Sequence, residues 1–173
     1  VDSLVGSEMC IRDSILITCL PSPKICAEVL ESKDGIIDTI QKDQIWIEMS
    51  TTEDDQLKKH ASLIQQTGAI ALEAPVSGGC HRAATGNISI FVGGSREGFD
   101  KAMPVLKCLG RKILYTGDFG SASILKVITN YLATVHLVAL GEAWTIASKS
   151  NLDLNKTFKA VSYTHLTLPT KWI

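Results

Sequence analysis

Residues 45–72 read IWIEMSTTEDDQLKKHASLIQQTGAIAL, and this stretch decides the fold class. Its first five residues, IWIEM, form a run rich in β-branched and aromatic side chains that predicts a buried strand. The following Ser50-Thr51-Thr52 can cap a helix, which we expect to extend to about Gln66 with three apolar residues on one face, Leu57, Ala61 and Ile64. A second short strand is expected at residues 70–72. A strand, a helix and a strand at this spacing are typical of an α/β domain with a mostly parallel sheet.

The flanking sequence continues this alternation on both sides. Upstream, the apolar run ILITCL at residues 15–20 stops at Pro21-Ser22-Pro23 and predicts another buried strand, followed by a helix from about residue 24 to residue 31. Downstream, the sequence predicts a strand at residues 88–92, a helix over about residues 96–106 and a strand over about residues 112–115. The chain therefore carries several strand and helix units in succession.

Ligands in such sheets lie beyond the carboxyl ends of the parallel strands. Three loops are expected there: Leu20-Pro21-Ser22, Ser50-Thr51-Thr52 and the glycine-rich Ala74-Pro75-Val76-Ser77-Gly78-Gly79. Consecutive glycines let backbone N–H groups approach an anionic group closely. An ordinary turn is the structural alternative for this last loop.

A long apolar helix is expected after residue 117, where residues 117–130 read GDFGSASILKVITN. Lys126 and Asn130 are four residues apart and therefore lie on one face of that helix. A helix that is apolar on nearly every side is normally buried, and desolvation lowers the pKa of a lysine toward the range useful for proton transfer. The alternative is that Lys126 extends along the surface and places its ammonium group in solvent.

The composition limits the classes of partner. With 45% hydrophobic residues, 20% charged residues and a net charge of −1, the chain offers no electrostatic argument for binding nucleic acid or an anionic membrane. Lys126, Asn130, His136 and Glu142 interrupt the long apolar run, so we expect no membrane-spanning segment. The five cysteines show neither a C-x-x-C pair nor metal-ligand spacing, so we expect reduced thiols and no metal site.

Both ends of the chain differ from the rest. Residues 1–14 and 161–173 contain VDSLVGSEMCIRDS and VSYTHLTLPT, which resemble translated sequencing adapters at the edges of assembled transcripts. We expect these two ends to be non-native and exclude them from fold reasoning. The alternative, a short natural leader beginning at Met9, lacks the apolar core of a signal peptide and the amphipathic pattern of a transit peptide.

Three motifs, taken in order, resemble the β-hydroxyacid dehydrogenase family, which includes 3-hydroxyisobutyrate dehydrogenases and glyoxylate/succinic semialdehyde reductases. They are ILITCLPSP with IWIEMSTT, then EAPVSGGCHRAATGNISIFVGG, then GDFGSASILKVITN continuing into ALGEAWTIASKSNLDL. The resemblance covers about residues 15–160. It implies a truncated Rossmann-like NAD(P)-binding domain at residues 15–116 and, at residues 117–160, a long interdomain helix with the start of a C-terminal helical domain.

The resemblance also implies roles for individual residues. Lys126 would be the general acid/base, and Asn130 would hydrogen-bond the substrate or orient that lysine. Three residues, Ser77, Gly78 and Gly79, would bind the substrate carboxylate. Leu20 and Pro21 would line the cofactor through backbone contacts, and Thr51 would lie on its nicotinamide side. The cofactor would be NADP or NAD, and the substrate a small carboxylic acid, either a β-hydroxy acid or a semialdehyde.

The chain departs from the family pattern at both ends. No G-x-G-x-x-G follows a strand, so the turn that grips the cofactor's pyrophosphate is missing, together with the segment that selects NAD or NADP. We therefore expect a fragment that is inactive by itself, cut from a homo-oligomeric parent enzyme of the cytoplasm, or of the mitochondrion if a transit peptide was lost. A dehydrogenase-derived binding or scaffold module is the non-enzyme alternative. A kinase-like mononucleotide domain is disfavoured because G-x-x-x-x-G-K-[ST] is absent.

Overall fold

The computed structural model describes residues 14–51 and 54–164. The chain divides into two compact units, Val1–Ile128 and Thr129–Ile173, and the division falls within one long helix. The predicted domain boundaries and the non-native ends stay predictions.

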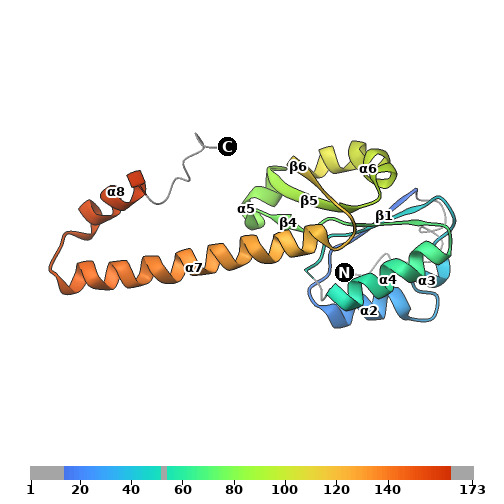
Figure 1. The fold of residues 1–173 in the computed structure, drawn as a ribbon, viewed down its shortest axis with the longest axis horizontal. Helices are drawn as coiled ribbons and strands as arrows, with labels where there is room; N and C mark the ends of the chain where they lie inside the picture. The colour runs from blue at the N-terminus through green and yellow to red at the C-terminus, as the bar shows by residue number, and fades with distance from the viewer. Residues whose placement is uncertain (1–13, 52–53, 165–173) are drawn as a thin grey trace. The chain divides into compact units, whose positions relative to one another are not determined.

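The first unit is built on a six-stranded sheet (Figure 1). Its strands are β1 (Ile15–Thr18), β2 (Ile45–Glu48), β3 (Ile70–Glu73), β4 (Val76–Ser77), β5 (Ile88–Gly94) and β6 (Gly110–Gly117). Pairs β1–β2, β2–β3 and β5–β6 are parallel, whereas β5 runs antiparallel to β3 and β4. The predicted mostly parallel α/β sheet is thus confirmed, with an antiparallel step after β3 that the sequence pattern did not indicate.

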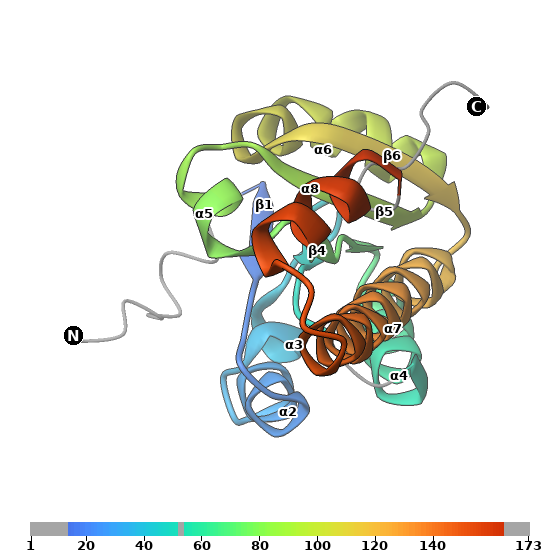
Figure 2. The ribbon, with the colours of Figure 1, turned by 90° about the vertical axis from the view of Figure 1, so that its left-hand side faces the viewer.

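Helices cover both faces of this sheet (Figures 1 and 2). On one face lie α2 (Pro23–Glu31), α3 (Ile36–Thr39) and α4 (Asp54–Gln66), and on the other lies α6 (Arg96–Leu109). The predicted face of α4 is confirmed, because Leu57, Ala61 and Ile64 are all buried. The predicted cap of α4 includes Thr52, which lies outside the described residues.

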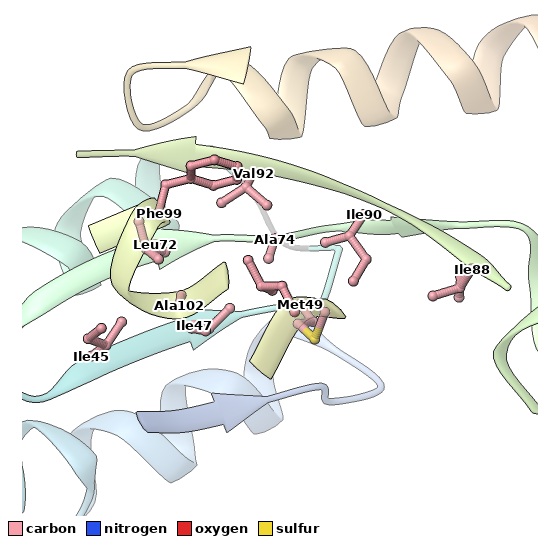
Figure 3. Close-up of a cluster of buried hydrophobic side chains, with 11 residues drawn as sticks. Ile45, Ile47, Met49, Leu72, Ala74, Ile88, Ile90, Val92, Phe99 and Ala102 are labelled. Atoms are coloured by element: carbon pink, nitrogen blue, oxygen red, sulfur yellow. The ribbon is translucent and has the colours of Figure 1, made fainter. Parts of the chain in front are cut away.

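Alternation along the strands divides the core into two clusters. Ile45 and Ile47 of β2 face α6, where they join Leu72, Ile90 and other apolar side chains (Figure 3). Trp46, between them in sequence, faces the opposite helices and is fully buried against residues such as Leu30 and Ile64. Successive side chains of a strand point to opposite faces, so one apolar strand supplies both clusters.

The long helix α7 (Ser121–Lys149) starts in the first unit and continues into the second, which also contains α8 (Leu154–Thr164). In the second unit, Asn151 adopts a positive φ of 55° after α7, and the Asp153 carboxylate accepts the backbone N–H groups of Asn155 and Lys156 at the start of α8. The Trp144 and Phe158 rings then pack edge to face, with 6.1 Å between their centroids.

Most apolar side chains of α7 are exposed, contrary to the burial expected of a helix that is apolar on nearly every side. Tyr131, Leu137 and Ile146 are 66%, 71% and 67% exposed. Among the described helices α7 is long and apolar enough to cross a membrane, with a mean hydropathy of 1.5 over its best window. One such helix is weak evidence for a membrane span, because the test uses length and composition only. The absence of a membrane-spanning segment stays a prediction.

Candidate functional site

The predicted cofactor residues lie at one edge of the sheet. Strands β1, β2 and β3 are parallel and in register, with Thr18 opposite Glu48 and Glu48 opposite Glu73, so their carboxyl ends coincide. Leu20 and Pro21 follow β1, and Thr51 follows β2. Pro21 and Thr51 are exposed, so this edge presents both side chains to solvent.

Ser50, which the sequence predicted only as part of a helix cap and a loop, joins two of these loops. Its hydroxyl oxygen accepts the Leu20 N–H at 2.7 Å, and its own N–H donates to the Glu48 carboxylate at 2.6 Å. Because the Leu20 N–H is already used and Pro21 has no N–H, these two residues can contact a cofactor through their backbone only by their carbonyl oxygens. The predicted backbone contacts to a cofactor are therefore limited to hydrogen bonds that the carbonyl oxygens of Leu20 and Pro21 accept.

A buried hydrogen-bond network fixes Glu48 itself. The Trp46 indole N–H donates to the Thr18 hydroxyl at 2.9 Å, and that hydroxyl donates to the Glu48 carboxylate at 2.7 Å. Glu48 is only 1% exposed. A buried carboxylate is costly unless hydrogen-bonded, so these donors explain how Glu48 is tolerated at the end of a core strand.

The predicted substrate loop is divided between two elements. Ser77 lies in β4, opposite Ser89 of β5, while Gly79 is the first residue of the short helix α5 (Gly79–Ala84). Gly78 and Gly79 have φ values of 136° and 72°, which side chains rarely adopt. A Cβ added to Gly78 would lie 2.9 Å from Cδ of Arg82, whereas a Cβ added to Gly79 would have no other atom within 4 Å. The glycines therefore permit a turn that leaves Gly79 open to a ligand.

Glu73, at the carboxyl end of β3, fixes the start of α7. One carboxylate oxygen accepts the N–H groups of Gly120 and Ala122 at 2.7 and 2.8 Å. The other accepts the Ser123 N–H at 3.2 Å and a short hydrogen bond from the Ser123 hydroxyl. Glu73 is fully buried. A carboxylate at a helix N-terminus satisfies N–H groups that have no partner within the helix and interacts favourably with the helix dipole.

This contact connects the two halves of the predicted site. Glu73 lies four residues before Ser77 in sequence, and Ser123 lies three residues before Lys126. One side chain thus joins the strand that leads to the substrate loop with the turn of α7 that precedes Lys126. Sequence reasoning missed this role. The available signal was an acidic residue placed directly after the apolar strand and before Ala74-Pro75, but its partners are 47 to 50 residues away.

Lys126 is half-buried on α7, and burial lowers the pKa of its ammonium group. Desolvation disfavours the charged form, which is the change that a proton-transfer role would require. Asn130 is exposed and is one helical turn further along α7, in the second unit. Cooperation between Lys126 and Asn130, and the position of the Lys126 amine relative to residues 77–79, stay predictions.

The comparisons identify what this chain is similar to. The family described as the NAD binding domain of 6-phosphogluconate dehydrogenase matches residues 5–117. The mitochondrial 3-hydroxyisobutyrate dehydrogenase of Mus musculus is 33% identical over 138 residues, which is 80% of this chain and 41% of that protein. The 3-hydroxyisobutyrate dehydrogenase of Pseudomonas aeruginosa is 32% identical over 146 residues, 84% of this chain and 49% of that protein.

The comparison with solved structures gives the same fold. The 3-hydroxyisobutyrate dehydrogenase of Mycobacterium tuberculosis, solved with L-serine, superposes with a TM-score of 0.85 at 26% identity, over 94% of this chain and 55% of that one. An imine reductase from Myxococcus stipitatus in complex with NADP+ shares the fold, with a TM-score of 0.78 at 17% identity over 91% of this chain and 54% of that one. The chain spans about half the length of the curated relatives it matches.

Proposed function

We propose, from the premise that this chain belongs to the family of NAD-binding domains of 6-phosphogluconate dehydrogenase, that its parent protein is an NAD(P)-dependent oxidoreductase. The reaction would transfer a hydride between the nicotinamide and a small β-hydroxy acid or semialdehyde. The names of the relatives, 3-hydroxyisobutyrate dehydrogenases from a mammal and a bacterium, support this substrate class.

The residues at the sheet edge fit the nicotinamide half of such a cofactor. Leu20 and Pro21 offer carbonyl oxygens, and the exposed Thr51 offers a hydroxyl group beside them. When bound, the cofactor supplies the hydride acceptor or donor. The Ser50 hydrogen bond to Leu20 holds the two loops together before any ligand arrives, which reduces the entropy lost on binding.

Lys126 would take the hydroxyl proton as the substrate carbon loses its hydride, and return it in the reductive direction. The observation that carries this role is its lowered pKa, caused by burial, on a helix start that Glu73 fixes to β3. A neutral amine is needed to accept the proton, and burial favours that form. The backbone of the Gly78-Gly79 turn, open at Gly79, would bind the carboxylate and so place the hydroxyl group near the amine.

The experiment is to assay the longer parent protein with Lys126→Ala. General acid–base catalysis contributes about 10²- to 10⁴-fold, so kcat should fall by that factor while the Kd for the cofactor stays unchanged. Lys107→Ala, which removes an exposed amine on α6, is the matched control and should keep full turnover. Unchanged turnover in Lys126→Ala would remove this lysine from the mechanism.

Assays of the longer parent protein also distinguish the enzyme hypothesis from the scaffold hypothesis. A parent that binds NAD(P) but reduces no small semialdehyde would support the non-catalytic alternative. We propose further that the 173-residue chain is inactive by itself, since it spans about half the length of its curated relatives. The exposed apolar side chains of α7 support a homo-oligomeric parent, which light scattering of that protein would test.

A further inference from the structure

A groove of about 470 Å³ lies outside the predicted substrate and catalytic residues. Its lining comes from α5, from the turn that follows α5, and from the first residues of β6, and consists of His81, Arg82, Thr85, Asn87, Arg111 and Lys112. This volume falls within the range of about 300–1,000 Å³ that is usual for small-molecule sites. All six residues are polar, which is unusual because such sites are mostly lined by apolar side chains.

The charges in this groove are all positive. Arg82, Arg111 and Lys112 form no ion pair with any residue in the described part of the chain, whereas Arg96 pairs with Asp100. Neither residues 74–96 nor residues 101–117, which build the groove, contain an aspartate or glutamate. The chain as a whole carries a net charge of −1, so this local concentration of cations is not a consequence of a basic composition.

An irregularity in β6 brings two of these cations to the same groove. The β5–β6 register passes from Ile88 opposite Gly110 to Ser89 opposite Lys112, so Arg111 is an extra residue at an irregularity of the kind that a β-bulge produces. Adjacent strand residues normally point to opposite faces, yet Arg111 and Lys112 both line the groove. Bulges re-aim side chains in this way and are common beside functional sites.

The opposite wall is held in place by its own hydrogen bonds. The Asn87 backbone N–H donates to the Arg82 carbonyl at 2.8 Å, and the Asn87 side-chain amide donates to the Thr85 hydroxyl at 3.2 Å. Gly86, with a φ of 65°, makes this turn possible. The Arg82 stem packs across Gly78, so the groove begins next to the loop predicted to bind the substrate carboxylate.

We propose that this groove binds a small organic oxyanion with two or more negative charges, either a phosphate monoester or a polycarboxylate. Two arginines present planar, two-pronged donors that match carboxylate and phosphate oxygens, and Lys112 adds a third cation. Asn87 and His81 supply further polar groups of the size and type that orient such a ligand. Lys126 is not among the residues that line the groove, and the proposal does not depend on the proposed dehydrogenase activity.

The test measures binding to the full 173-residue chain by NMR titration of its backbone amides. The probes are glycerol 3-phosphate and citrate, with glycerol as the neutral control. Saturable shifts centred on residues 81–87 and 110–112 are expected for at least one of the two anions, and the stronger one identifies the ligand class. Glycerol should cause no shift, because it lacks the charge that the two arginines and Lys112 would bind.

Matched charge removal makes the test specific. The double variant Arg111→Ala with Lys112→Ala should weaken binding of the anion at least about tenfold, since each of the two substitutions removes a charge-assisted hydrogen bond. Lys33→Ala with Lys107→Ala removes the same charge from exposed positions elsewhere and should leave the Kd unchanged. Equal weakening in both double variants, shifts that never saturate, or tighter binding of a single-stranded oligonucleotide would each overturn the proposal. Far-UV circular dichroism of both variants checks that the fold is retained.

Discussion

Replacing Glu73 by glutamine should weaken the attachment of α7 to the sheet without changing the volume of the buried side chain. The amide oxygen can keep the two hydrogen bonds from Gly120 and Ala122 as a neutral acceptor. The new NH2 group can donate to the Ser123 hydroxyl, but it cannot accept the Ser123 N–H, which is left facing another donor. Because Glu73 is fully buried, water cannot replace the lost partner.

The magnitude follows from these contacts. Losing one hydrogen bond to a charged group costs about 1.5–3 kcal/mol, and losing the negative charge at the helix N-terminus costs about 0.3–2 kcal/mol more. We therefore expect Glu73→Gln to lower the free energy of unfolding by about 3 kcal/mol. With a urea m-value of about 1–3 kcal/mol/M, the midpoint of unfolding should fall by at least about 1 M.

The assay is urea unfolding followed by circular dichroism, together with amide hydrogen exchange at the first turn of α7. Exchange at Gly120, Ala122 and Ser123 should accelerate in Glu73→Gln. Glu97→Gln is the matched control, because Glu97 also lies in the first turn of a helix, α6, but is exposed and pairs with Lys101 at 2.7 Å, so its loss should lower the midpoint much less. A midpoint and exchange rates equal to those of the unmodified chain would refute the assigned role of Glu73.

Three further predictions concern this edge of the sheet and the first turns of α7. Gly93→Ala should lower the free energy of unfolding by about 1–3 kcal/mol and speed amide exchange at the start of α7. The added Cβ would press on the Glu73 carboxylate and lie 3.1 Å from the Asp118 carbonyl oxygen. Unchanged exchange would contradict this. Ser50→Ala should cost about 1–2 kcal/mol in urea unfolding by removing the acceptor of the Leu20 N–H. The Lys126 amine should titrate, by NMR, below the usual lysine pKa of about 10.4 because burial opposes its charge. The unfolded chain then binds more protons between the two pKa values, so stability should rise with pH in that window, and Lys126→Met should abolish that rise.

Much of the fold could be predicted from local patterns. The apolar runs before Pro21 and Ser50 correspond to β1 and β2, and the spacing of apolar residues in residues 54–66 placed the buried face of α4. These features depend on side-chain period and on caps, which act over a few residues. The antiparallel direction of β5 was not predictable, because it depends on pairing between residues distant in sequence.

The candidate site was predictable only in part, for the same reason. Residues that a motif names, such as Lys126 and Gly78, could be proposed from the sequence. The residues that hold them could not, since Glu73 acts on backbone groups 47 to 50 positions later and no local pattern marks that partner. The exposure of α7 was also missed, because a helix that is apolar all round indicates only that some surface covers it. The pattern of the helix does not identify the surface that covers it.

The two buried carboxylates at this edge also bear on the choice of proton acceptor. Glu48 and Glu73 end adjacent strands in direct register, and they are 1% and 0% exposed. Within the described part of the chain, the four hydrogen bonds to the Glu73 carboxylate and the two to the Glu48 carboxylate all come from N–H or O–H donors of the protein. A carboxylate committed to such donors and closed to solvent has no free access to a substrate hydroxyl group. Both acids therefore support the edge of the sheet. In the proposed reaction a base outside this pair would accept the proton, which is the role proposed for Lys126.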